Sequence, residues 1–193
     1  MRVILGSASP RRREILEQAG IEFEIITSDL EEKITSRFPW EVVLELSRMK
    51  ALDVYSKAGE KYNNDNDLLV IGADTIVALD GKIFGKPEDE EAAYEMLKAL
   101  SGRVHEVYTG VTVITQDMDL SFASCTEVSV YELEREEILK YIATKEPMDK
   151  AGAYAIQGGF AKYIKEIKGE YNNVVGFPIA AMIYELKKAG IVL

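Results

Sequence analysis

A basic turn near the N-terminus is the first feature of this sequence that could do chemistry. Residues 7–12 read Ser-Ala-Ser-Pro-Arg-Arg and separate a short apolar run from a segment with helical spacing. Because a helix start offers free backbone N–H groups and the positive end of the helix dipole, such a turn can hold phosphate. Ser7 and Ser9 could add hydroxyl donors, and Arg11 and Arg12 could clamp phosphate oxygens. Taken alone, the turn is explained equally well by a capped surface helix with solvated arginines.

Carboxylates form the second candidate group. Asp74 follows the continuous apolar run 68–73, a pattern typical of a strand buried on both faces. A carboxylate there is costly unless it meets a metal, a cation or donors, so Asp74 is a candidate metal ligand or general base. A turn cap is the weaker alternative. Asp29, Glu31 and Glu32 could supply a second carboxylate for a divalent cation, although acidic loops are usually just solvated.

The remaining candidate residues do not indicate a function when each is considered alone. Lys50 and Lys86 are single lysines, which usually lie on the surface. The one histidine, His105, lacks the companions of a metal site, so we assign it a structural or peripheral role. The one cysteine, Cys125, is predicted to be a small buried hydrophobe. The sequence contains no P-loop, dinucleotide glycine fingerprint or Gly-x-Ser-x-Gly elbow.

Hydrophobic periodicity and turn residues predict the elements that must position these side chains. Helices are expected at 10–19, 39–58, 90–100, 134–144 and 178–189, and strands at 3–5, 21–27, 68–79, 83–84, 104–115, 120–133 and 160–167. Ser9 is expected to cap the first helix and Gly20 to follow its end. Asp80-Gly81 predicts a hairpin, and the polar segment 63–67 predicts a turn.

Composition limits the function classes. With 47% apolar and 29% charged residues among 193, the chain is expected to fold as one compact globular unit. A net charge of -10 argues against a partner that is a nucleic-acid polymer, because such affinity comes from clustered cations. No stretch is long and apolar enough to span a membrane. The N-terminus has the wrong order of charge for a signal peptide, and a single cysteine agrees with a cytoplasmic protein.

Taken together, ordered motifs across nearly the whole chain resemble the Maf family, also called septum-formation inhibitor-like proteins. The motifs are Ser7-Ala8-Ser9-Pro10-Arg11-Arg12, Lys50-Ala51, Gly72-Ala73-Asp74-Thr75, Gly85-Lys86-Pro87, Ser101-Gly102-Arg103 and Lys150-Ala151-Gly152-Ala153-Tyr154. One such motif would be weak evidence, but the ordered set is highly specific.

The resemblance implies a mixed α/β fold with an elongated central sheet flanked by helices and two lobes around a cleft, related to the inosine triphosphate pyrophosphatases. It implies hydrolysis of a nucleoside triphosphate between the α and β phosphates, with Mg²⁺ or Mn²⁺ as cofactor. Asp74 would be the proton acceptor and, with Glu32, a metal ligand. Lys50 and Lys86 would share the polar cleft with the residues of the basic turn. A homodimer is plausible by the same resemblance.

The family also implies a choice of nucleotide. One branch prefers dTTP and UTP and another 7-methyl-GTP, and the positions linked to that choice match Arg11, Thr75 and Gln157. The segment Ile156-Gln157-Gly158 resembles the dTTP/UTP branch. The glutamine amide offers a donor and an acceptor, which suits the imide edge of thymine or uracil.

Three alternatives to a dTTP/UTP pyrophosphatase are open at this point. The chain could be a catalytically weak nucleotide-binding regulator of cell division or septum formation. It could be another phosphate-ester enzyme, such as a phosphatase that removes terminal phosphates. It could also act on a modified nucleotide, because a house-cleaning enzyme needs to reject the abundant normal ones.

Overall fold

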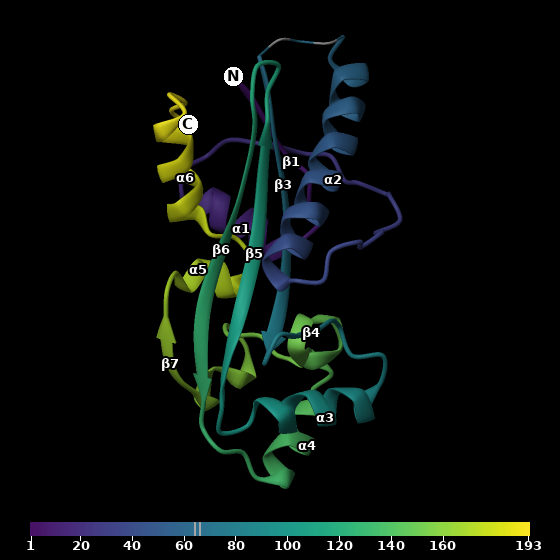
Figure 1. The fold of residues 1–193 in the computed structure, drawn as a ribbon, viewed down its shortest axis with the longest axis vertical. Helices are drawn as coiled ribbons and strands as arrows, with labels where there is room; N and C mark the ends of the chain where they lie inside the picture. Colours follow the sequence, from purple (N-terminus) through teal and green to yellow (C-terminus); the bar gives the residue numbers. More distant parts are fainter. Residues whose placement is uncertain (64, 66) are drawn as a thin grey trace.

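The computed structural model describes residues 1–63, 65 and 67–193. Within these residues, seven strands form one mixed sheet in the order β2-β1-β3-β5-β6-β7, with β4 paired to β3. The strands are β1 (Arg2–Leu5), β2 (Glu24–Ile25), β3 (Leu68–Leu79), β4 (Lys82–Phe84), β5 (Val104–Ile114), β6 (Asp119–Val130) and β7 (Ile164–Lys168). β1 pairs parallel with β2 and β3, and the other pairs are antiparallel. The predicted mixed α/β fold with a long central sheet is confirmed (Figure 1).

Helices cover the sheet in two groups. They are α1 (Pro10–Gln18), α2 (Pro39–Lys61), α3 (Glu90–Leu100), α4 (Arg135–Ala143), α5 (Tyr171–Val175) and α6 (Ile179–Lys188). Figure 1 shows α1, α2 and α6 around the upper half of the long strands, and α3 and α4 below. Short 3-10 helices span Glu146–Asp149, Ala151–Ala153 and Gly159–Tyr163. No helix within the described part of the chain is long and apolar enough to cross a membrane.

Two glycines let α2 lie directly on the backbone of the sheet. A Cβ at Gly72 on β3 would lie 2.4 Å from the carbonyl oxygen of Ser47, and one at Gly110 on β5 would lie 2.1 Å from that of Val43. Any larger residue would push the helix away. The close approach brings the middle of α2 to the point of β3 where Asp74 stands.

β3 is buried on both faces up to the candidate base, as predicted. Leu69 and Ile71 belong to the main core, whereas Leu68 and Val70 pack with Val54 of α2 in a second cluster. Burial of these side chains on two faces fixes the strand by the hydrophobic effect. The fully buried run ends at Asp74, which is only partly covered. The sheet therefore presents this carboxylate from a rigid support.

Most predicted elements are confirmed, but two strands differ from the sequence prediction. The expected strand 21–27 pairs only over Glu24–Ile25, and the expected strand 160–167 begins only at Ile164. The start of the latter is a 3-10 helix because Phe160 is buried among aromatic rings, with ring centroids of Tyr154 and Tyr163 at 4.9 and 5.4 Å. The short helix α5 was not predicted. Of the expected turn 63–67, positions 64 and 66 lie outside the described residues.

One prediction about a single residue is confirmed only in position, and one is wrong. Ser9 occupies the N-cap position of α1, but its side chain makes no capping hydrogen bond. Its backbone N–H instead donates to Ser7 Oγ at 3.2 Å. Cys125 is exposed rather than buried, because the first half of β6 alternates between exposed and half-covered side chains.

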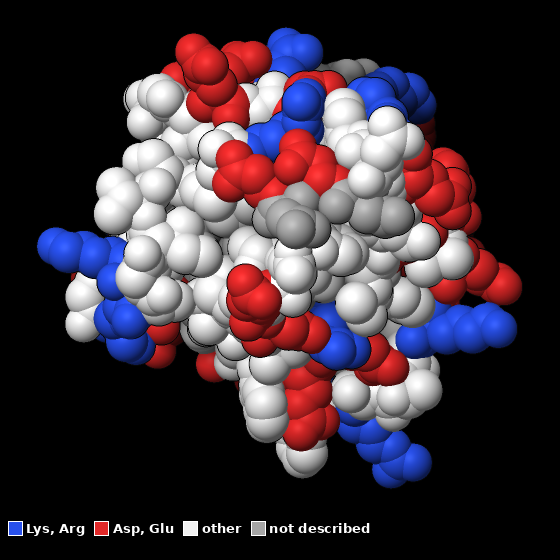
Figure 2. Space-filling view, turned by 90° about the horizontal axis from the view of Figure 1, so that it is seen from above, with Lys and Arg blue, Asp and Glu red and all other residues white. Residues whose placement is uncertain are grey.

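The charged side chains are interspersed on the end of the molecule shown in Figure 2. Acidic and basic groups of the described residues alternate there across the surface rather than gathering into one basic area. Nucleic-acid polymers are bound through clustered cations, so this face does not offer such a surface.

Candidate active site

A cleft with a volume of about 680 Å³ opens along the second half of β3. Its walls come from segments far apart in the sequence, namely the β1–α1 turn, the segment between β2 and α2, α2 itself, β3, the residues after β4, and segments 149–151 and 174–176. The predicted site residues that line it are Arg11, Arg12, Glu32, Lys50, Asp74, Thr75 and Lys86. The fold thus brings together residues from both ends of the chain.

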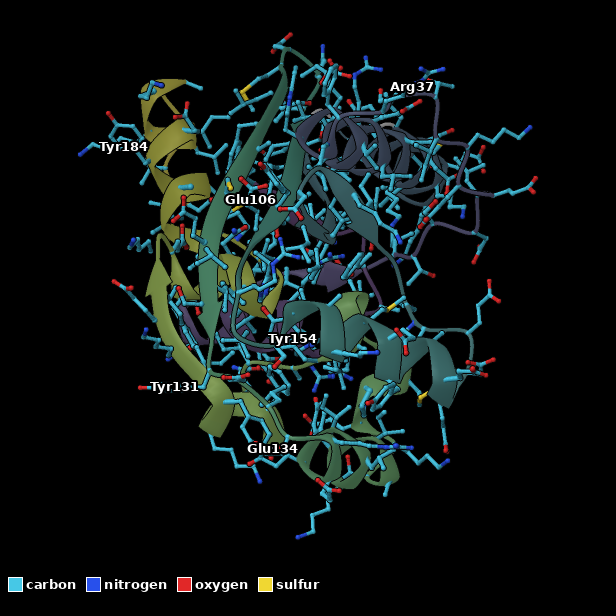
Figure 3. The ribbon with its side chains drawn as sticks, turned by 60° about the horizontal axis from the view of Figure 1, so that its bottom comes forward. Arg37, Glu106, Tyr131, Glu134, Tyr154 and Tyr184 are labelled. Carbon is cyan, nitrogen blue, oxygen red and sulfur yellow. The ribbon has the colours of Figure 1, made fainter. Side chains whose placement is uncertain are left out.

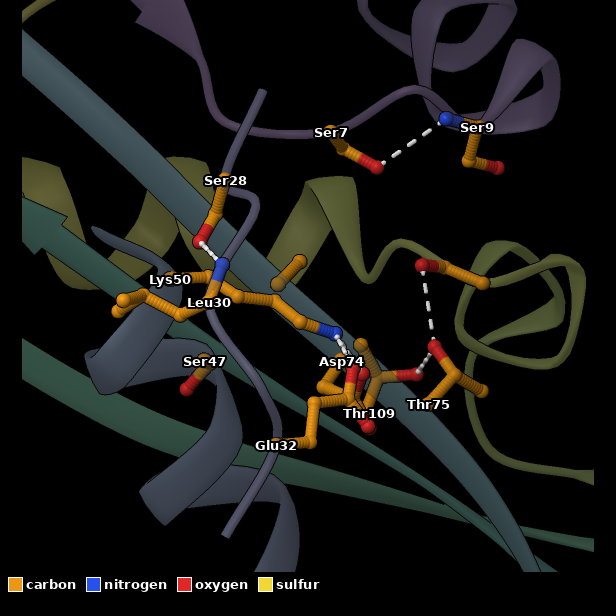
Figure 4. A network of polar contacts seen from close by, with 12 residues as sticks. Ser7, Ser9, Ser28, Leu30, Glu32, Ser47, Lys50, Asp74, Thr75 and Thr109 are labelled. Atoms are coloured by element: carbon orange, nitrogen blue, oxygen red, sulfur yellow. Dashed lines mark hydrogen bonds and ion pairs between the residues drawn. The ribbon is translucent and has the colours of Figure 1, made fainter. Parts of the chain in front are cut away.

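A lysine stands between two carboxylates at the centre of this cleft. Lys50 Nζ lies 2.5 Å from Asp74 Oδ1 and 2.7 Å from Glu32 Oε1. The Asp74 side chain is only 14% exposed, so its charge needs a partner nearby. Lys50 reaches it because α2 packs onto β3 at Gly72. Figure 4 shows Lys50, Glu32 and Asp74 converging from three separate segments.

Arg12, which lines the cleft, ties four segments together. Its Nη1 donates to Ser7 Oγ at 3.1 Å and to the carbonyl oxygen of Ala73 at 2.8 Å. Its Nε donates to the carbonyl oxygen of Gly176 at 2.9 Å, and its Nη2 donates to Thr75 Oγ1 at 3.1 Å. A guanidinium has five N–H donors, so one remains for a ligand. Desolvation lowers the pKa of Arg12, and the charge of Asp74 opposes that effect.

Thr75 is held in the same network, beside the candidate base. Its hydroxyl lies 2.9 Å from Thr109 Oγ1 and 3.3 Å from the carbonyl oxygen of Gly176 (Figure 4). The Thr109 hydroxyl in turn lies 3.2 Å from the carbonyl oxygen of Asn173. The segment after α5 is thereby fixed against the strand that carries Asp74.

Two predicted residues stand apart from the cleft lining. Ser7 is 9% exposed and contacts Arg12 from behind, so it supports the arginine. Gln157 is exposed and lies in the turn before the 3-10 helix Gly159–Tyr163. That turn is fixed by Glu146, whose carboxylate oxygens accept hydrogen bonds from the Gly159 N–H at 3.1 Å.

Lys150, Tyr154 and Ile34 line the cleft, although sequence reasoning did not assign them to the site. Lys150 and Tyr154 lie on one wall, and Ile34 comes from the segment before α2. The signal for the first two was present, since both belong to the motif Lys150-Ala151-Gly152-Ala153-Tyr154. Ile34 follows an acidic stretch and carries no comparable signal.

Tyr154 is held by the buried His105. Its hydroxyl lies 2.7 Å from His105 Nε2, and the two rings meet edge to face at 5.3 Å. Burial lowers the pKa of His105 to about 4, so the imidazole is neutral at neutral pH. Figure 3 shows Tyr154 inside the molecule, whereas Tyr184 points outward. His105 therefore orients one wall of the cleft.

The donor set at the centre fits a divalent cation that is bound together with phosphate. The described residues contain no preformed group of three or more acidic, His or Cys side chains around one point. Two carboxylates, Glu32 and Asp74, do converge on the Lys50 ammonium, so both face one position that suits a positive charge. Mg²⁺ is commonly held by one or two carboxylates with substrate phosphates and waters.

Comparisons with known proteins decide the family. The profile described as Maf-like protein matches residues 2–189. The chain belongs to the Maf-like protein family. A dTTP/UTP pyrophosphatase of Agathobacter rectalis is 50% identical over 200 residues, covering 98% of this chain and 98% of that protein. One of Lachnoclostridium phytofermentans is 47% identical over 194 residues, covering 98% and 95%. One of Bacillus thuringiensis is 47% identical over 191 residues, covering 98% and 96%.

A solved structure shows a weaker likeness to this Maf-like chain. The Staphylococcus aureus Ham1 protein aligns with a TM-score of 0.43 and 16% identity, covering 67% of this chain and 72% of that one. A similarity of this size does not bear on the site, and the expected relation to inosine triphosphate pyrophosphatases stays a prediction.

Proposed function

We propose that this Maf-like protein is a nucleoside triphosphate pyrophosphatase that hydrolyses dTTP and UTP to the nucleoside monophosphate and pyrophosphate. The observation that carries the proposal is the pairing of Lys50 with both Asp74 and Glu32 in a cleft rich in cations. Relatives about half identical over nearly their whole length bear the name dTTP/UTP pyrophosphatase, which supports the same substrates here. The proposal includes modified pyrimidine nucleotides as substrates.

The cations have different tasks in this proposal. Four of the five N–H donors of Arg12 form hydrogen bonds within the protein, so this residue mainly stabilises the structure around the cleft and has one N–H left for phosphate. Arg11 and Lys86 both line the cleft and supply charge to the triphosphate. We therefore assign the main contact with phosphate oxygens to Arg11 rather than to Arg12.

Asp74 acts as the general base for an attacking water. In the free protein its carboxylate is paired with the Lys50 ammonium. A bound triphosphate competes for that ammonium, and transfer of Lys50 to a phosphate oxygen frees Asp74 Oδ1 to accept the proton, while the second carboxylate oxygen remains for a metal ion. The same transfer places a positive charge where negative charge grows on the leaving pyrophosphate.

We propose Mg²⁺ or Mn²⁺ as the cofactor, held by Glu32 and Asp74 together with the phosphates. When bound, such a cation neutralises phosphate charge and polarises the phosphorus that water attacks. Glu32 is 49% exposed on the segment above the cleft, so a ligand that arrives from solvent can reach it.

Selection of the base is assigned to Gln157, Thr75 and Arg11. Thr75 is fixed by hydrogen bonds to Arg12 and Thr109 and therefore offers a rigid surface. Gln157 lies on an exposed turn apart from the cleft lining, and its assignment to the imide edge of thymine or uracil follows from the family resemblance. A panel of nucleoside triphosphates, assayed with Mg²⁺ and with Mn²⁺ and with identification of the released phosphate species, tests this function.

A further inference from the structure

The segment between β2 and α2, residues 26–38, runs antiparallel along one side of α2. Its contacts follow the helix in reverse order. Lys57 Nζ donates to Asp29 Oδ2 and to the carbonyl oxygen of Thr27, both at 3.1 Å. Lys50 then meets Glu32 at 2.7 Å. Figure 1 shows this segment passing outside α2 without helix or strand structure. We call residues 27–36 the strap.

The end of the strap is held by one carboxylate, that of Glu45 on α2. Thr35 Oγ1 donates to Glu45 Oε1 at 2.7 Å, and the Thr35 N–H lies 3.1 Å from Oε2 and 3.2 Å from Oε1. The Ser36 N–H donates to Oε2 at 3.1 Å. These hydrogen bonds lower the pKa of Glu45 to about 2. An ionised carboxylate is the one side chain of this shape that accepts at both oxygens.

The start of the strap is held by Lys57. Its ammonium also contacts Asp53 Oδ2 at 2.9 Å, one helical turn earlier on α2. The cation therefore has acceptors on the helix and on the strap at once. Glu32 stands midway between the two attachments, three residues after Asp29 and three before Thr35.

This placement determines where Glu32 can lie. A chain of about ten residues without regular structure loses substantial conformational entropy when it is ordered, on the order of 1 kcal/mol or more per residue. The contact of Glu32 with Lys50 is half exposed and contributes little stability by itself. Among these contacts, the several hydrogen bonds that Glu45 accepts from Thr35 and Ser36 therefore contribute most to the order that holds Glu32 above Asp74.

We propose that Glu45 is a positioning residue, which fixes the strap and thereby holds Glu32 at the cleft for the cation and the triphosphate. It touches no reacting atom and acts only through Thr35 and Ser36. This inference rests on the proposed function for the role of Glu32, but the attachment itself is independent of any activity.

Trypsin cleavage after Lys33 of the folded full-length protein tests the attachment directly. Lys33 is exposed in the middle of the strap, and cleavage there requires the strap to leave the helix locally. Glu45→Gln replaces one accepting oxygen by a donor that faces backbone N–H groups, so we expect cleavage about tenfold faster. Thr35→Val removes one hydrogen bond and should give a smaller increase. Glu60→Gln, an exposed position near the end of the same helix, is the matched control and should leave the rate unchanged.

Kinetics then test the link to Glu32. Glu45→Gln should lower kcat/KM for dTTP about tenfold and raise the Mg²⁺ concentration needed for half activation, and in a Glu32→Ala background the same change should cost nothing further. Unchanged trypsin cleavage in Glu45→Gln, or a full penalty in the Glu32→Ala background, would overturn the inference. A third outcome separates the two claims. If trypsin cleaves Glu45→Gln faster but even the unsubstituted protein releases no pyrophosphate from any nucleotide, the proposed function is rejected and the attachment of the strap by Glu45 is supported.

Discussion

Lys50 Nζ lies 2.5 Å from Asp74 Oδ1, so the candidate base and its nearest cation are paired before any substrate binds. The pair joins a helix to the central strand and contacts Glu32 on the strap. A triphosphate that draws Lys50 away would release the base at the moment it is needed.

Asp74→Asn removes the proton acceptor and keeps the shape of the side chain. We expect kcat to fall by about 10²–10⁴-fold, which is the usual contribution of a positioned general base. The thermal unfolding midpoint should stay close to that of the unsubstituted protein. Asp80→Asn, on the hairpin that follows the same strand, is the control and should keep full activity. A nearly normal kcat in Asp74→Asn would show that Asp74 is not the general base.

Arg12→Lys should mainly reduce stability. A lysine cannot reproduce the four hydrogen bonds of the guanidinium and leaves the carbonyl oxygens of Ala73 and Gly176 short of a donor. We expect the free energy of unfolding to fall by about 2–4 kcal/mol in urea titrations. Arg11→Lys should instead raise KM with little change in stability. The reverse pattern would make Arg12 the phosphate clamp.

His105 should make stability depend on pH. Its folded pKa of about 4 lies below the ordinary value of 6.5, so the unfolded chain binds the proton more readily. The stability due to the neutral imidazole is complete above pH 6.5 and is lost as the pH falls towards 4, by about 3 kcal/mol in all. His105→Gln should flatten the curve of unfolding free energy in this window. Parallel curves for the two proteins would contradict the buried neutral state.

Gln157→Glu tests the choice of base. The change replaces the amide donor by a second acceptor, so the imide edge of thymine or uracil loses one hydrogen bond. We expect kcat/KM for dTTP and UTP to fall about tenfold relative to purine triphosphates, since an unpaired polar group is costly. Kinetics on all four ribonucleotides and dTTP provide the measurement. An unaltered ranking of substrates would show that Gln157 does not read the base.

Local patterns were sufficient for much of the fold. A continuous apolar run predicted β3, and Asp80-Gly81 predicted its hairpin, where both residues have positive φ, 52° and 77°. Helical spacing from Pro39 predicted α2 and placed Lys50 on it. Such elements are predictable because the pattern of apolar and turn residues that specifies each of them lies within one short stretch of sequence.

Long-range contacts of the site were beyond local patterns. Arg12 bonds to Gly176, which is 164 residues away in the sequence, so nothing near the turn indicates that its donors are occupied. Phe160 follows a strand-like pattern, yet an aromatic cluster holds it in a 3-10 turn. The strap carries no periodicity, and its path along α2 depends on Glu45 and Lys57, which look like ordinary surface charges in the sequence.

The phosphate species released from dTTP and UTP tests the central claim most directly. The unsubstituted protein is incubated with each nucleotide and Mg²⁺ or Mn²⁺, and the products are separated and quantified, with Asp74→Asn as the blank. Our account predicts one pyrophosphate and one nucleoside monophosphate per triphosphate consumed, and loss of both when the metal is chelated. Orthophosphate with a nucleoside diphosphate would contradict it and indicate a terminal phosphatase, and binding without turnover would indicate a regulator.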